Sequence, residues 1–194
     1  MSSLKNASVI DLAFPHDWQA EILQARPLIL PQRHFTYPAV ADEVERGALE
    51  VLVRLEHGAE FLATCALGFR SPVVPTGIWS CPNPEEICAV SGGYAYVVST
   101  RDPARFSMIS FRPVLEVRAV AQAGLLLFVG HHSILARGAA GTAWESAKLS
   151  DEGVAITAID GESLSGRGWN MMTDKESLFT LDLRDGRIRN KHFD

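Results

Sequence analysis

Two adjacent histidines, His131 and His132, are the side chains best suited to proton transfer in this chain. Imidazole changes its charge near neutral pH and is also a common metal ligand. Acid–base catalysis on a small polar substrate would need one of them to meet a carboxylate, such as Asp160 or Asp174, within hydrogen-bond reach. Neighbouring residues of a strand face opposite sides, so the pair cannot easily share one metal ion. We expect the two rings to lie at a turn after Gly130, and we assign no metal ligand and no catalytic residue.

The tryptophans offer a different chemistry, which is stacking against a flat ligand or a partner side chain. Trp144 and Trp169 follow apolar stretches of the second half of the chain. Core packing is the usual role of such large rings. Trp169 lies in the stretch GRGWN, where glycines could let a ligand approach the backbone. With Asn170 and Asp174 it would form a small recognition patch.

Familiar catalytic and cofactor motifs are missing from the sequence. There is no GxxxxGK phosphate loop, no GxGxxG after a strand, and no HExxH. The stretch GESLSG at 161–166 has a serine where a nucleophile elbow needs its last glycine. The carboxylates of the last fifty residues fit turns and outward strand positions. We therefore expect no cofactor.

The elements that must position these residues are mainly strands. From residue 48 apolar and polar residues alternate, which predicts a hairpin over 48–69. Glycines at 93, 124 and 153 each begin a unit of apolar strand, polar turn and second strand. Asp160-Gly161 and Asp185-Gly186 are typical centres of two-residue hairpin turns. The pattern predicts an antiparallel β meander over 48–194.

The N-terminal part, residues 1–47, is predicted to wrap this meander with one or two short helices. Asp17 could cap the first helix, which would end before Pro27. The second would run through AVADEVERG and end at Gly47. We expect one mainly β domain over 1–194, packed as two sheets or as an incomplete propeller-like array.

Composition restricts the functional class. The chain has 47% apolar and 21% charged residues and a net charge of −5, which is ordinary for a globular protein. A net negative charge without lysine and arginine runs argues against nucleic-acid binding. Neither a signal peptide nor an apolar run near the ~20 residues of a membrane helix is present. Three cysteines, at 65, 81 and 88, fit a reducing compartment, so we predict a cytoplasmic protein.

Residues 126–146 resemble one blade of a quinoprotein-type β-propeller. The matching positions are Leu126, Phe128, Val129, Ile134, Ala136, Gly141 and Trp144. The stretch LFTLDLRDGRI at 178–188 resembles the second half of such a blade. The order of WSCPNP, GGYAYVV, AWES and GWN is also similar to that of small bacterial β-rich proteins. That resemblance implies no activity.

These observations favour a non-catalytic protein-binding or interaction module of the bacterial cytoplasm. Two alternatives stay open. One is an enzyme that acts on a small polar substrate through His131, His132, Asp160 and Asp174, and the other is a small-ligand binder that uses Trp144 or Trp169. Because open sheets expose edge strands, we expect a protein partner or a homodimer, and neither nucleic acid nor a membrane.

Overall fold

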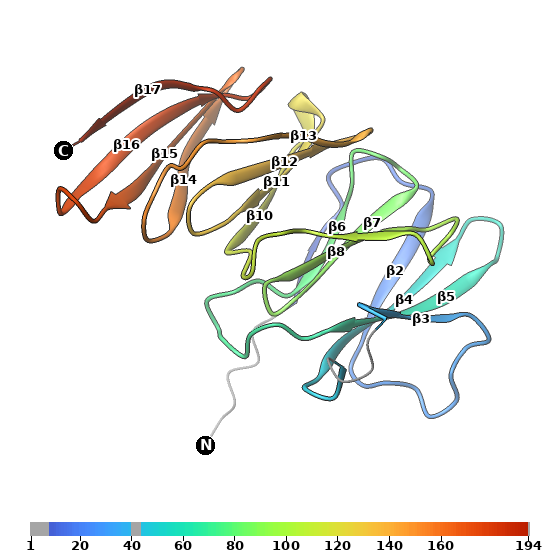
Figure 1. Cartoon of the computed structure of the whole chain (residues 1–194). Helices are drawn as coiled ribbons and strands as arrows, with labels where there is room; N and C mark the ends of the chain where they lie inside the picture. Colours follow the sequence, from blue (N-terminus) through green and yellow to red (C-terminus); the bar gives the residue numbers. More distant parts are fainter. Residues whose placement is uncertain (1–7, 40–43, 194) are drawn as a thin grey trace. The chain divides into compact units, whose positions relative to one another are not determined.

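The computed structural model describes residues 8–39 and 44–193, and strands dominate it (Figure 1). The chain divides into two compact units, Met1–Pro113 and Val114–Asp194. The strands form one five-stranded and three four-stranded sheets. The prediction of a mainly β protein is therefore confirmed, with four small sheets. That residues 1–194 form one domain stays a prediction.

Unit 1 contains two sheets, with strand orders β1-β6-β7-β8-β9 and β2-β4-β5-β3. The strands are β1 Val9–Asp11, β2 Trp18–Leu23, β3 His34–Tyr37, β4 Ala48–Leu55, β5 Glu60–Ala66, β6 Gly77–Ser80, β7 Glu86–Ser91, β8 Tyr94–Ser99 and β9 Phe106–Met108. The antiparallel pairing of β4 with β5 confirms the hairpin predicted over 48–69.

The N-terminal segment supplies strands to both sheets of unit 1. The helix predicted between Asp17 and Pro27 is wrong, because Trp18–Leu23 is a strand paired with β4. Trp18, Ala20 and Ile22 alternate with polar Gln19 and Glu21, and this period of two places the three apolar residues against the core. The long-range pairing with β4 overrides the helical spacing of Trp18 and Ile22.

Two further strands of this segment run parallel to their partners: β1 pairs with β6, and β3 pairs with β5. The N-terminal segment thus forms strands in both sheets of unit 1, whereas the sequence predicts only a segment that wraps the meander. Part of the helix predicted over 39–47 lies outside the described residues, because 40–43 are not among them.

The core of unit 1 lies between the inward faces of its two sheets. Val51, Val53 and Phe61 come from one sheet, and Ile78 and Tyr96 from the other. All five are fully buried. Alternate residues along each strand reach this core, as a pleated strand requires.

Unit 2 is built from two four-stranded antiparallel meanders, β10-β11-β12-β13 and β14-β15-β16-β17, in chain order. Their strands are β10 Glu116–Val120, β11 Leu125–Val129, β12 Ile134–Gly138, β13 Gly141–Glu145, β14 Val154–Asp160, β15 Ser163–Asn170, β16 Lys175–Asp182 and β17 Ile188–Phe193, and a 3-10 turn, η1 Ala121–Ala123, precedes β11. Each strand pairs with the next along the chain, which confirms the predicted antiparallel meander for this unit.

The three glycine-led segments do begin strands, but at different places in their sheets. Gly93, Gly124 and Gly153 precede β8, β11 and β14. These strands are the fourth of a five-stranded order, the second of a meander and the first of a meander. The β14–β15 turn is also shifted by one residue from its prediction, since Asp160 pairs with Ser163 and the turn is centred on Gly161-Glu162.

Trp144 belongs to the core of unit 2. It is 7% exposed and packs with residues of both meanders, among them Leu127, Leu164 and Phe179. Its indole Nε1 donates a 2.7 Å hydrogen bond to the carbonyl oxygen of Leu183. Gly186 has a φ of +70°, and a Cβ there would lie 2.5 Å from the Trp144 ring. The β16–β17 turn is therefore shaped around this tryptophan.

Trp144→Phe should destabilise the protein, because it leaves the Leu183 carbonyl without its donor and removes buried ring atoms. We expect the free energy of unfolding in a urea titration to fall by about 2 kcal/mol. Trp169→Phe is the matched control, since Trp169 is half-buried and its indole donates no hydrogen bond within the described residues. Equal losses for the two variants would contradict this role for Trp144.

Candidate functional site

His131 and His132 lie at the turn between β11 and β12, as the sequence predicts. Both side chains are exposed, and their ring centroids are 6.3 Å apart. The Nδ1 atom of His132 lies 3.1 Å from the carbonyl oxygen of Ser150. A carbonyl oxygen only accepts hydrogen bonds, so this contact requires a proton on Nδ1.

The segment that joins the two meanders connects this turn to Trp169. The backbone N–H of Leu149 donates to the carbonyl of His132 at 2.7 Å, and that of Asp151 donates to the carbonyl of Trp169 at 2.8 Å. Ser150 is 3% exposed, and its Oγ accepts a 2.8 Å hydrogen bond from the backbone N–H of Trp169. Backbone and side-chain bonds together fix residues 148–151 between the two turns.

A shallow groove of about 210 Å³ forms along this segment. We name it the Trp169 surface and define it by residues 148–151, 169–172 and Lys191. Trp169 and Asn170 come from the end of β15, and Lys191 comes from β17. The neighbouring methionines extend from the β15–β16 turn, with Met171 66% and Met172 91% exposed.

The charges of the Trp169 surface are partly paired. The Lys148 ammonium lies 2.5 Å from Asp151 Oδ1, and the backbone N–H of Met171 donates to Asp151 Oδ2 at 2.8 Å. These two contacts, that of Lys148 first, lower the pKa of the Asp151 carboxyl. Among the described residues, Lys191 Nζ makes only long contacts, of 3.4 and 3.3 Å, with the carbonyls of Lys148 and Leu149. Lys191 therefore retains donor capacity for another acceptor.

The structure brings together only some of the candidate site residues that the sequence predicts. His131, His132, Trp169 and Asn170 lie at the connected end of the meanders, and Asp174 occupies the β15–β16 turn with a φ of +54°. Asp160 lies at the other end of the β14–β15 hairpin, opposite Ser163. The eight residues of β15 place roughly 23 Å between these ends at about 3.3 Å per residue.

The glycines beside Trp169 make room for side chains of the protein itself, and not for the ligand that the sequence suggested. A Cβ on Gly166 would lie 2.4 Å from the Phe179 ring, and one on Gly168 would lie 2.5 Å from the Ser150 side chain. Gly168 thus allows Ser150 to reach the backbone of Trp169. Trp144, the other candidate for stacking, is enclosed in the core.

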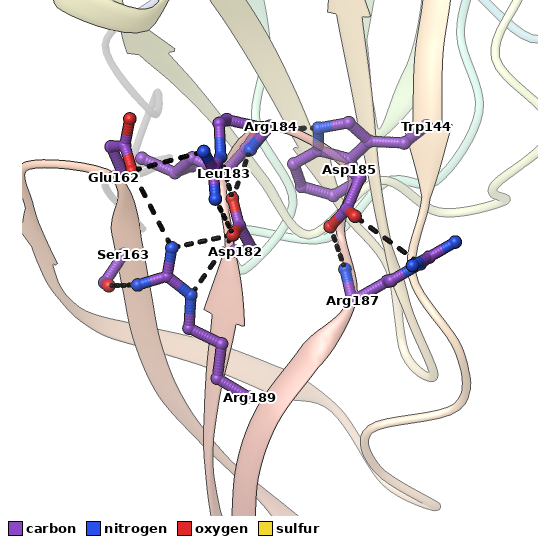
Figure 2. Close-up of polar contacts among 9 residues, drawn as sticks. All are labelled: Trp144, Glu162, Ser163, Asp182, Leu183, Arg184, Asp185, Arg187 and Arg189. Atoms are coloured by element: carbon purple, nitrogen blue, oxygen red, sulfur yellow. Dashed lines mark hydrogen bonds and ion pairs between the residues drawn. The ribbon is translucent and has the colours of Figure 1, made fainter.

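A network of arginines and carboxylates holds the opposite end of this unit together (Figure 2). Figure 2 shows Arg184 and Arg189 converging on Asp182, with shortest nitrogen–oxygen distances of 2.9 and 2.7 Å. Glu162 and Ser163 add contacts to the same arginines. The guanidinium of Arg184, followed by that of Arg189, lowers the pKa of the Asp182 carboxyl far below its ordinary range. The network links β15, β16 and β17 at the turn beneath Trp144.

Asp182→Asn should make the protein less stable at neutral pH and less sensitive to acid. Because the folded-state pKa of Asp182 is depressed, its contribution is present above the unfolded-state pKa of about 3.9 and is lost as the pH falls below that value. Urea titrations at pH 7 and pH 3 should show a gap between wild type and variant at pH 7 that shrinks at pH 3. A gap that is the same at both pH values would contradict the proposed charge interaction.

The sequence analysis does not identify all the residues that form the Trp169 surface. Lys148 and Lys191 are isolated in the sequence and meet only because β17 lies beside the 148–151 segment. The adjacent pair Met171-Met172 is a signal that the sequence does carry, since it follows Trp169-Asn170 at a turn. Within 8–39 and 44–193, no group of three or more His, Cys, Asp or Glu residues is placed to hold a metal ion.

Comparison with known proteins gives no family to which these features can be referred. The chain matches no protein-family model, and no curated protein is significantly similar to it. Function must therefore be inferred from the geometry itself.

Proposed function

We propose that this protein is a non-catalytic interaction module that binds a partner protein through the Trp169 surface. The observation that carries the proposal is the pair of exposed methionines beside a half-buried tryptophan and a lysine with unused donor capacity. Methionine and aromatic side chains are enriched at the centres of protein interfaces, because they bury much apolar area. Methionine also adapts its shape to different partners.

The size of the groove supports a protein partner over a free small molecule. About 210 Å³ is below the range of about 300–1,000 Å³ that is usual for small-molecule pockets. It suits one side chain of a partner, inserted between Met172 and Lys191. The lysine ammonium favours a carboxylate, so the partner segment should carry an acidic residue next to an apolar one.

The rigidity of the 148–151 segment, which lines the groove, also supports binding. Ser150 and Asp151 are tied to Trp169 and Met171 by hydrogen bonds of 2.8 Å. A preorganised surface loses little conformational entropy on binding. The exposed methionines then supply the adaptable part of the contact.

Acid–base catalysis is the less favoured function for this site. It needs a histidine and a carboxylate in one pocket, whereas Asp160 lies at the end of the hairpin remote from His132. The Nδ1 atom of His132 is engaged with a backbone carbonyl. Only its Nε2 atom would be available as a base.

Location in the bacterial cytoplasm is part of the proposal. Cys65, Cys81 and Cys88 are buried and form no disulfide among the described residues, which suits a reducing compartment. Burial, with the Glu50 carboxylate nearby, raises the pKa of the Cys65 thiol and makes it unreactive. In the part of the chain that the structure describes, no helix is long and apolar enough to cross a membrane. We also propose that nucleic acid is not a partner.

The resemblance to propeller blades belongs to the proposal as well. Each meander of unit 2 has four strands in chain order, which is the composition of one propeller blade. Within this arrangement the Trp169 surface combines part of the β15–β16 turn, residues 171–172, with the 148–151 segment between the two meanders.

The proposal predicts site-specific cross-linking to one partner. A benzoylphenylalanine at position 172 should cross-link a partner protein in the bacterial cytoplasm, whereas the same group at position 187 should not. Arg187 is a matched control because its side chain is 86% exposed and lies at the opposite end of the unit. The partner is then identified by mass spectrometry and purified.

With the purified partner, Lys191→Glu should weaken binding by about tenfold, as loss of a central interface charge does. Arg187→Glu reverses a charge outside the surface and should leave the affinity unchanged. Equal cross-linking from both positions, or equal affinities of the two variants, would contradict the proposal. A cross-link to a second copy alone would replace the partner protein with a homodimer.

A further inference from the structure

A second cavity lies in unit 1, and its lining contains none of the residues that the sequence analysis singles out as a binding site. It has a volume of about 480 Å³ and is formed where β2 begins and where β4 turns into β5. The turn is held by the backbone N–H of Gly58, which donates to the carbonyl of Leu55 at 2.9 Å. The backbone N–H of Glu56 donates to the carbonyl of Asp17 at 3.3 Å, which joins the turn to the start of β2. The size falls in the range of about 300–1,000 Å³ typical of ligand sites.

The lining of this cavity is dominated by acceptors. Glu56 and Glu60 bring carboxylates, and Arg54 is the one charged donor. Arg54 is shared between Glu60 and Glu21, at 3.4 Å from each. Glu56 forms no ion pair with any described residue. The lining thus has two carboxylates for one guanidinium, and the exposed Glu56 carboxylate is available to a cationic ligand.

His16 adds an aromatic ring to the lining. Its Nδ1 lies 2.8 Å from the carbonyl oxygen of Phe14, and because a carbonyl only accepts hydrogen bonds, this contact places a proton on Nδ1. The ring rests on Trp18, with centroids 4.5 Å apart. His16 is half-buried, so part of its flat ring is available to a ligand in the cavity.

Trp18 adds an unsatisfied hydrogen-bond donor next to this cavity. It lines the cavity, is 3% exposed, and its buried indole Nε1 has no hydrogen-bond acceptor among the described residues. Buried donors are nearly always paired, because an unpaired one loses its bonds to water without compensation. The Nε1 atom is itself enclosed, so a ligand oxygen would complete this donor after a shift of the Trp18 ring.

We propose that this cavity binds a guanidinium cation whose carrier also brings a carbonyl oxygen. A guanidinium group has five donors in one plane, so it can pair with Glu56 and Glu60 and stack on the His16 ring. The carbonyl oxygen would accept from Trp18 Nε1. An arginine residue of a peptide and a free arginine derivative share this chemistry.

The test uses the full-length protein and isothermal titration calorimetry. N-acetyl-L-argininamide should bind, and its neutral isostere N-acetyl-L-citrullinamide should bind at least about tenfold more weakly, because it lacks the charge that the carboxylates pair with. Agmatine has the guanidinium group without the carbonyl. Tighter binding of the argininamide than of agmatine supports the carbonyl contact and an arginine residue as the source, whereas equal or tighter binding of agmatine would overturn the carbonyl contact.

Substitutions locate the site. Glu56→Gln keeps the size of the side chain and should weaken argininamide binding by about tenfold, whereas Glu152→Gln, an exposed position of unit 2, should not. Circular dichroism of both variants checks that the fold is kept. Absence of argininamide binding at millimolar concentration, equal binding of the citrulline isostere, or an unchanged affinity of Glu56→Gln would each overturn the proposal. None of these results bears on the Trp169 surface, so the two proposals fail separately.

Discussion

The hydrogen bond between the Trp169 backbone and the Ser150 side chain is the interaction on which the functional end of unit 2 depends. Ser150 also accepts from the backbone N–H of Glu152 at 3.1 Å, and its carbonyl lies against His132. One small buried residue thus connects the β11–β12 turn, the segment between the meanders and the end of β15. Gly168 is needed for the same reason, since any side chain there would occupy the space of Ser150.

Much of this fold can be predicted from the sequence, because it is made of hairpins between strands that follow each other along the chain. Alternation of buried residues identifies β4 with β5, and the apolar run before Gly130 identifies β11. Strands that pair with their neighbours in sequence leave their signature within a short window. The sequence also predicts a recognition patch at Trp169 and Asn170, and the structure places both residues beside a groove.

The parts that the sequence does not reveal are those fixed by distant contacts. Trp18–Leu23 has a spacing compatible with a helix, and only the pairing with β4 makes it a strand. Lys191 joins the Trp169 surface from a strand about forty residues away from Lys148 along the chain. The cavity of unit 1 combines His16 and Trp18 with Glu56 in the same way, through the register that sets Trp18 opposite Leu55. No pattern within a short window of the sequence predicts contacts between residues that lie so far apart along the chain.

The parallel pairing of β1 with β6 has a consequence for the time at which each unit can be completed. Val9 lies opposite Gly77, which is 68 positions later in the chain, so β1 has no partner until β6 has been synthesised. In unit 2, by contrast, every strand finds its partner in the strand before it or after it. Proteins rich in near-neighbour contacts fold faster than those that must close long loops. During translation the first unit therefore waits for its own later residues, while the second can assemble hairpin by hairpin as it emerges.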